Sequence, residues 1–278
     1  TREINPGQLL MRVEPAADHM PAERSVWVLS LNNEGNFGDR LGGHVLGQVL
    51  PANARVTHIH HKPWDAPLEG GPDLLVLGIG NSLFQPLLTD DLLRLVDRAG
   101  RTVGVFGTQY RRDIEPSRLS SLLDRLDSWW ARYEEDLLLY GAGRRNARHL
   151  GDWLIEAFPL ARWTRDEQLV VGSEVNANAP MDRIIERIQA YRKVDSPRLH
   201  PLLCALTSAE EVSYAEQRER ENPDTASEKF RSMLLDVFGM EKPERQFWAV
   251  DRAAVQAYKA RVRRNVSELR THLAKVLA

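Results

Sequence analysis

The sequence predicts an α/β protein with an open parallel sheet, then a second, smaller α/β unit and a long C-terminal helix. Two observations in the first half support this prediction. Short runs of Val, Leu and Ile are bounded by glycine, which is typical of strands buried on both faces of a parallel sheet. Helical patterns lie between these runs, and that alternation favours right-handed crossovers. Such sheets bind ligands at the carboxyl ends of their strands.

The elements of the first half follow from these runs. Strands are predicted at 25–31, 55–60, 73–80 and 102–107, and a further one just before Arg132. Helices are predicted from about 39 to 49 and from 87 to 99, where the leucines recur at three and four residues.

The second unit begins near Leu169, after a polar linker at roughly 162–168. It is abbreviated, because only about three strands are visible. These strands lie at 169–172, 193–196 and 211–214, and helices at 182–191 and 197–206 separate them. The charged stretch 216–223 has no apolar period and predicts a solvated loop, with a substrate lid as the alternative. The predicted parts are therefore 1–165, 166–250 and 251–278.

The last part, about 252–278, is predicted to be one helix. Its apolar residues step by three or four and form a single stripe, and lysines and arginines occupy the other faces. Two interpretations remain open. The stripe packs along the protein, or the helix lies on a membrane surface.

Composition limits the partners. The chain has 278 residues and a formal charge of −2, so it has no overall attraction for nucleic acid. No apolar run approaches the roughly 20 residues that span a bilayer. No signal peptide is visible, so a cytoplasmic location is expected. The single cysteine, Cys204, lies in an apolar run and is expected to be a buried structural thiol.

Two glycine-containing turns follow predicted strands. Asn36 and Gly38 lie in the first, and Gly80 and Asn81 in the second. Glycine lets the backbone approach a ligand, and a helix that follows offers free N–H groups to an anion. We therefore expect these four residues to line a polar ligand. Asp39 either caps the following helix or acts as a general base.

Basic residues supply the rest of the candidate site. Arg132 follows a predicted strand and could clamp a carboxylate or phosphate, or pair with Glu134 or Glu135. Arg198 and His200 lie at the end of another strand, where a helix begins, and could hold an anion and move a proton. The histidines at 58, 60 and 61 lack a further ligand at a convincing spacing, so no metal site is expected.

Four ordered segments resemble the polysaccharide pyruvyl transferases. Residues 36–39, Asn-Phe-Gly-Asp, match the N-x-G-D turn of that family, and 73–84 match its strand and glycine turn. Residues 132–137 with 149–152 are similar to its R-D-x-x-S and G-D-P elements. Residues 194–200, Val-Asp-Ser-Pro-Arg-Leu-His, match V-x-S-x-R-L-H, the most specific motif of the set.

The resemblance implies a GT-B-like pair of Rossmann-like domains with phosphoenolpyruvate held in the cleft between them, and no cofactor. By motif position, Arg198, His200 and Arg132 contact this donor, Asp39 lies nearby and the backbone at Leu199 contributes. The implied reaction forms a pyruvate ketal on a sugar of a glycan or lipid-linked oligosaccharide. That acceptor would place the protein at the inner face of the membrane.

The sequence leaves two other functions open. A GT-B-like glycosyltransferase would use the same architecture with a nucleotide-sugar donor, and Arg198 would then face a diphosphate or a sugar acid. A non-catalytic glycan-binding or assembly protein would keep the fold and tolerate loss of Arg198 and His200. The sequence does not indicate an oligomeric state.

Overall fold

A computed structural model describes residues 22–32, 36–172, 175, 179–219 and 223–278. Within them, a six-stranded sheet has the order β2-β1-β3-β4-β5-β6, and every neighbouring pair is parallel. Its strands are β1 (Arg24–Asn32), β2 (Ala54–Lys62), β3 (Leu74–Leu77), β4 (Arg101–Gly104), β5 (Ser128–Ala131) and β6 (Ala147–His149). The predicted parallel sheet is confirmed. β3 is shorter than predicted because the chain turns at Gly78, whose φ is +82°.

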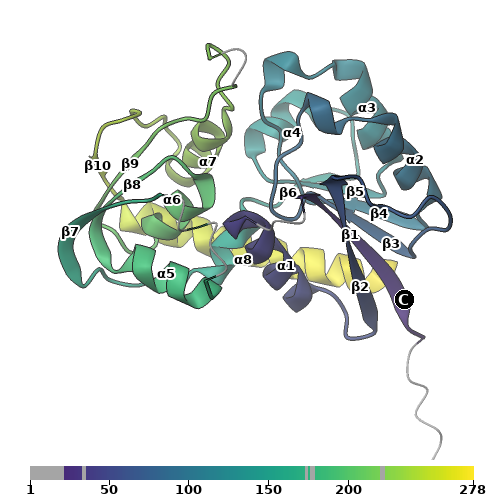
Figure 1. Ribbon diagram of the computed structural model, residues 1–278, viewed down its shortest axis with the longest axis horizontal. Coiled ribbons are helices and arrows are strands. Elements are labelled where there is room, and N and C mark those ends of the chain that lie inside the picture. The colour runs from purple at the N-terminus through teal and green to yellow at the C-terminus, as the bar shows by residue number, and fades with distance from the viewer. Residues whose placement is uncertain (1–21, 33–35, 173–174, 176–178, 220–222) are drawn as a thin grey trace, which may run out of the picture.

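Helices cover both faces of this sheet (Figure 1). They are α1 (Phe37–Val49), α2 (Asp90–Arg98), α3 (Pro116–Arg125) and α4 (Glu134–Tyr140), with short 3₁₀ turns η1 (Gln85–Leu87), η2 (Arg111–Asp113) and η3 (Trp153–Ala157). Alternation along the strands explains the two layers. Val26 and Val28 join the apolar cluster that holds α1, whereas Leu75 and Leu77 join the one that holds α2 and α3.

The second sheet has the order β10-β9-β8-β7 within the described residues. Its elements are β7 (Arg165–Val170), α5 (Met181–Gln189), β8 (Tyr191–Ser196), α6 (Leu199–Leu206), β9 (Glu211–Tyr214), α7 (Lys229–Phe238) and β10 (Trp248–Ala249). β7, β8 and β9 are parallel to one another. β10 pairs antiparallel with β9 at the edge of the sheet, and its two residues are too few for a sequence pattern to reveal. The predicted linker at 162–168 was too long, because β7 already begins at Arg165.

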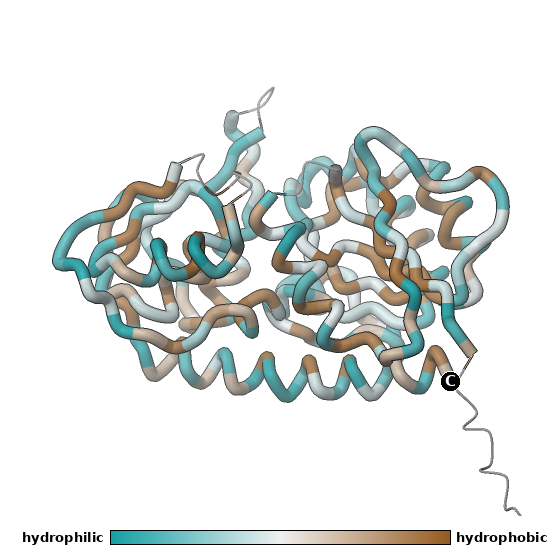
Figure 2. Tube along the Cα trace, turned by 60° about the horizontal axis from the view of Figure 1, so that its bottom comes forward, coloured by the Kyte–Doolittle hydropathy of each residue, from teal (hydrophilic) through white to brown (hydrophobic). Residues whose placement is uncertain are grey.

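The C-terminal helix α8 (Arg252–Val276) is confirmed, and it runs beneath both sheets (Figure 2). Its stripe is buried at Val255, Tyr258, Val262, Val266, Leu269 and Leu273. The apolar face is therefore covered by protein, and the interpretation of this stripe as a membrane-binding face was wrong. No helix in the described part of the chain is long and apolar enough to cross a membrane.

One apolar cluster is continuous between the two sheets. It contains Val28 of β1, Leu203 of α6 and Val262 of α8, so the C-terminal helix packs against both units. Cys204 is fully buried in the same cluster, as predicted for a structural thiol. The division at 165 and 250, and the pair of Rossmann-like domains, stay predictions.

Candidate functional site

A polar cavity of about 220 Å³ lies where the carboxyl ends of β1, β3, β5 and β8 meet. Eight of the nine predicted site residues line it: Asn36, Gly38, Gly80, Asn81, Arg132, Arg198, Leu199 and His200. The ninth, Asp39, lies behind this lining. Residues from both sheets thus converge on one site, as expected where parallel strands end.

Two glycines bring the backbone turns together. A Cβ on Gly80 would lie 2.5 Å from Cα of Asp39, so the turn after β3 packs directly on the first turn of α1. A Cβ on Gly38 would overlap Nδ1 of His200 and lie 2.6 Å from its Cε1. The imidazole of His200 therefore occupies the space that the absent side chain of Gly38 leaves.

Asn36 and Asp39 close the first turn of α1 reciprocally. Asn36 is the N-cap, its Oδ1 accepts the N–H of Asp39 at 3.1 Å, and its Nδ2 donates to Oδ2 of Asp39 at 2.7 Å. The other oxygen, Oδ1 of Asp39, is buried without a partner in the described structure. Burial raises the pKa of Asp39 to about 6, against the opposing charges of Arg132 and His60.

Arg132 is 1% exposed and points across the sheet edge, where Nη2 donates to the carbonyl of Gly78 at 3.3 Å. Its alternative role, a salt bridge to Glu134 or Glu135, was wrong. Glu135 instead pairs with Arg111 and Arg231. Nε of Arg132 is buried and unpartnered within the described residues, so part of its fork is available to a ligand.

His200 lies in the first turn of α6, with Nε2 3.7 Å from Oδ2 of Asp152. His200 is 9% exposed and lines the cavity. Burial, and then the charges of Arg132 and Lys229, hold the pKa of His200 well below its usual range. The ring is therefore neutral near pH 7 in the protein without an anion.

Lys229 is a site residue that the sequence analysis missed. It is the first residue of α7 and lines the same cavity as Arg132. Burial lowers the pKa of Lys229 to about 8; Glu216 opposes this shift, and Arg132 and Arg198 add to it. Among the residues that the structure describes, the side chains of Lys229 and Arg198 make no hydrogen bond or ion pair; the backbone of Arg198 is hydrogen-bonded to Oγ of Ser196. A helix start is the sequence signal that would draw attention to Lys229. Here α7 begins after Glu228 without a side-chain cap, so no capping pattern marks that start.

Asp152 is the second missed residue. Its motif segment was recognised, but no site role was assigned to it. The carboxyl is fully buried, neither oxygen has a hydrogen-bond partner among the described residues, and burial raises its pKa against the charge of Arg132. Asp152 lies behind His200, outside the cavity lining, so it contacts the site through that imidazole.

The loop predicted to be solvated at 216–223 contributes to this region. Glu216 is 8% exposed, accepts a hydrogen bond from Ser227 Oγ and lies close enough to Lys229 to affect its pKa. The prediction of a solvated segment was therefore wrong at Glu216, because its carboxylate is buried and hydrogen-bonded to Ser227. Residues 220–222 lie outside the described residues.

The site is cationic. Among the described residues, three positive side chains, Arg132, Arg198 and Lys229, line the cavity, and no carboxylate does. Unpartnered buried polar atoms surround it in the described structure: Oδ1 of Asn81, Oγ of Ser82, Nε of Arg132 and Nε2 of His200. Buried polar groups normally find partners, so this concentration marks a site built to bind a polar ligand. The described residues contain no group of three or more His, Cys, Asp or Glu that could hold a metal.

Comparisons with known proteins show no family. No family model matches the sequence, and no curated protein matches it. Among solved structures, an uncharacterized protein from Klebsiella pneumoniae has 13% identity and a TM-score of 0.49, over 77% of this chain and 87% of its own. An α-glucosyltransferase in complex with UDP and DNA has 10% identity and a TM-score of 0.40, over 92% and 95%. Similarity this distant carries no information on activity.

Proposed function

We propose that this protein transfers the pyruvyl group of phosphoenolpyruvate to two hydroxyls of a sugar, forming a ketal and releasing phosphate. One observation carries the proposal. Three cations from three separate elements, Arg132, Arg198 and Lys229, face one small cavity beside the buried imidazole of His200. A small ligand with both a carboxylate and a phosphate fits this charge arrangement, because guanidinium groups grip both anions bidentately.

The size of the cavity favours this donor over a nucleotide sugar. Its volume is about 220 Å³. That is below the range of roughly 300–1,000 Å³ that is usual for ligand pockets. Phosphoenolpyruvate is a small molecule, whereas a nucleotide sugar carries a base, two sugars and a diphosphate. Within the part of the chain that the structure describes, the lining also lacks a carboxylate to receive ribose hydroxyls.

The reaction can be written with these side chains. One proton adds to the methylene carbon of the donor and makes it a methyl group, which leaves the neighbouring carbon electrophilic. A sugar hydroxyl adds to that carbon and gives up its proton. The bond to the phosphate oxygen then breaks, a second hydroxyl adds, and its proton leaves on the phosphate. Arg132, Arg198 and Lys229 balance the charge of the donor and of the departing phosphate throughout.

His200 is the residue best placed to supply the first proton. Its pKa is lowered by burial and by the charges of Arg132 and Lys229. A bound multivalent anion offsets those charges and favours the protonated imidazole, which Asp152 would stabilise from 3.7 Å. Asp39, with a pKa of about 6, is largely ionised at pH 7 and keeps its proposed role as base. Since it lies behind the lining, we expect it to act through Asn36 or a water molecule.

The direct test is an activity measurement. Purified protein is mixed with phosphoenolpyruvate and a panel of simple hexosides, and both free phosphate and the mass of the sugar products are followed. Phosphate release that depends on a hexoside, together with a pyruvate ketal on that hexoside, supports the proposal. Sugar transfer from a nucleotide sugar, with no ketal from phosphoenolpyruvate, contradicts it.

A further inference from the structure

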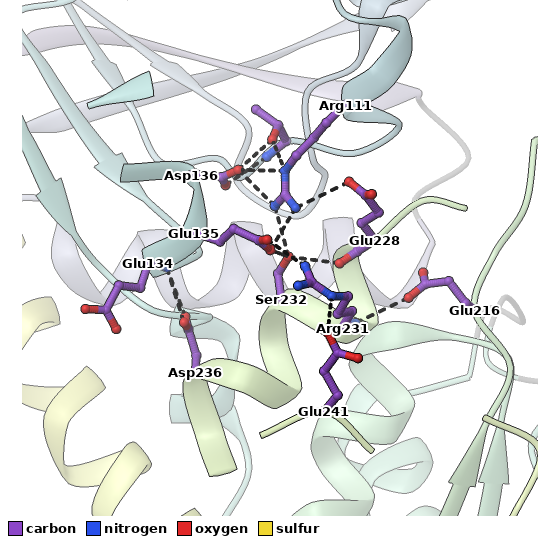
Figure 3. Close-up of polar contacts among 11 residues, drawn as sticks. Arg111, Glu134, Glu135, Asp136, Glu216, Glu228, Arg231, Ser232, Asp236 and Glu241 are labelled. Carbon is purple, nitrogen blue, oxygen red and sulfur yellow. Dashed lines mark hydrogen bonds and ion pairs between the residues drawn. The ribbon is translucent and has the colours of Figure 1, made fainter. Parts of the chain in front are cut away.

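A network of charges around one buried arginine joins the two units (Figure 3). Its centre is Arg111 of η2, whose side chain is 6% exposed. Nη1 of Arg111 donates to Oε2 of Glu135 at 2.9 Å, and Nη2 donates to Oδ1 of Asp136 at 3.0 Å. Both carboxylates belong to α4, on the side of the first sheet.

The same network reaches α7 of the second unit. Arg231 donates from Nη1 to Oε1 of Glu135 at 2.6 Å, and Ser232 donates from Oγ to Oε2 of Glu135 at 2.7 Å. Arg111 also donates to Oγ of Ser232 at 2.9 Å. Both oxygens of Glu135 thus hold α7 against α4, and Figure 3 shows this carboxylate between the two helices.

A second link fixes the direction of α4 relative to α7. The backbone N–H of Glu134, at the start of α4, donates to the carboxylate of Asp236 at 3.2 Å. Asp236 belongs to α7 and also pairs with Nε2 of His149 at 3.0 Å. The first turn of α4 is therefore linked to α7 at two places, near the start of α7 at Arg231 and Ser232 and near its end at Asp236.

The backbone at this junction is held in an uncommon conformation. Tyr110 and Glu228 have φ values of 51° and 63°, in the left-handed region that residues other than glycine rarely adopt. The N–H of Tyr110 donates to the carbonyl of Ser227 at 3.2 Å, so the two residues belong to the same contact. Such conformations persist where surrounding structure fixes them, and they gather at functional sites.

Two residues of the network lie close in sequence to two cations of the cavity. Glu135 follows Arg132 by three residues, and Arg231 follows Lys229 by two. Arg132 and Lys229 line the same cavity from opposite units. We propose that Glu135 and Arg111 are positioning residues, which fix Lys229 in the same cavity as Arg132 so that the two cations grip one anion together. This inference rests on the anion cavity of the proposed function and not on pyruvyl transfer itself.

The physical reason lies in the ion pairs of Arg111, whose side chain is buried, whereas the pair between Glu135 and Arg231 is partly exposed. The desolvation cost of buried ion pairs offsets most of their attraction, so they add little net stability, whereas their geometry can fix a single arrangement of the parts they join. Lys229 and Arg132 repel each other when the cavity holds no anion. Without the network we expect α7 to relax away from α4, and Lys229 would then lose its contact with the anion.

The test is a double-mutant cycle read by phosphate binding, with Glu135→Gln and Lys229→Met in the full chain. Inorganic phosphate is titrated calorimetrically into wild type, each single variant and the double variant. Glu135→Gln is preferred to a change at Arg111, because loss of Arg111 would leave the buried Asp136 unpaired. Ser232→Ala serves as a second variant of the network. Glu210→Gln, which breaks an exposed pair with Arg192, is the matched control for loss of one carboxylate.

We expect Glu135→Gln to weaken phosphate binding about tenfold when Lys229 is present and hardly at all when Lys229 is Met, a coupling of about 1.4 kcal/mol. Ser232→Ala should show the same dependence, and Glu210→Gln should bind as wild type. Equal weakening in both backgrounds would contradict the positioning role. If phosphate binding shows the expected coupling between Glu135 and Lys229 but no ketal forms, pyruvyl transfer alone is refuted. If the wild type does not bind phosphate, both proposals are refuted.

Discussion

Nε2 of His200 lies 3.7 Å from Oδ2 of the fully buried Asp152, while the opposite side of the ring packs against Gly38. The imidazole is thus fixed between a carboxylate and a backbone turn and opens to the cavity. A neutral ring in this position can take up a proton when an anion binds, and the carboxylate stabilises the charge that results.

Replacement of His200 by Asn should separate binding from turnover. A positioned proton donor contributes about 10²–10⁴-fold to a rate. We expect a loss of turnover in that range, with affinity for phosphoenolpyruvate within a fewfold of wild type, since the cations remain. Calorimetry and phosphate release measure the two quantities. His44→Asn, on the exposed side of α1, is the control. Unchanged turnover in His200→Asn would exclude the imidazole from the reaction.

Gly38→Ala should impair the site through sterics alone. The added methyl would overlap the imidazole of His200, so the ring must move out of its position. Gly47 lies on the same helix with no atom within 4 Å of an added Cβ. Gly47→Ala should therefore raise the free energy of unfolding by about 1 kcal/mol and leave turnover unchanged. If Gly38→Ala retains full turnover, the close fit between Gly38 and His200 has no role in activity.

Because of Lys229, the affinity for phosphoenolpyruvate should decrease at alkaline pH. Burial lowers the pKa of this lysine to about 8, so the side chain loses its charge as the pH rises through that value. Affinity for phosphoenolpyruvate should fall about tenfold between pH 7 and pH 9.5, by loss of one charged contact. Lys229→Met should bind more weakly at pH 7 and show no such fall. The same pH dependence in both proteins would assign it to another group.

Asp39 should make the protein less stable as the pH rises from about 4 to 6. Its folded pKa of about 6 exceeds its unfolded value of 3.8, so the folded state holds the proton more tightly. The stabilisation is complete below the unfolded value and is lost as pH rises through 6, by at most about 3 kcal/mol. Asp39→Asn lacks this titration. Denaturant unfolding of both proteins at pH 4 and pH 7 gives the difference, and an equal change in both would contradict the shift.

The sequence predicted much of this site because the topology brings its parts together. Asn36, Gly80, Arg132 and Arg198 lie far apart in the chain, but each follows a parallel strand, and the carboxyl ends of parallel strands meet at one edge. The parallel sheet was predictable because buried Val and Leu runs identify such strands.

The missed residues depend on contacts that no local pattern records. Lys229 starts a helix without a side-chain cap, and its neighbours Arg231 and Ser232 find their partners about a hundred residues away in α4. Asp152 reaches His200 only after α6 packs on η3. Similarly, the pairing of Arg132 with Glu135 that proximity suggested is replaced by the pairing of Glu135 with Arg111.

Calorimetric titration with phosphoenolpyruvate, beside a panel of nucleotides and nucleotide sugars, shows which donor the cavity binds. Wild type should bind phosphoenolpyruvate saturably and ignore the nucleotides, and Arg198→Ala should abolish that binding while it leaves the fold intact by circular dichroism. Binding of a nucleotide sugar in place of phosphoenolpyruvate, or phosphoenolpyruvate binding that Arg198→Ala does not change, would contradict the account.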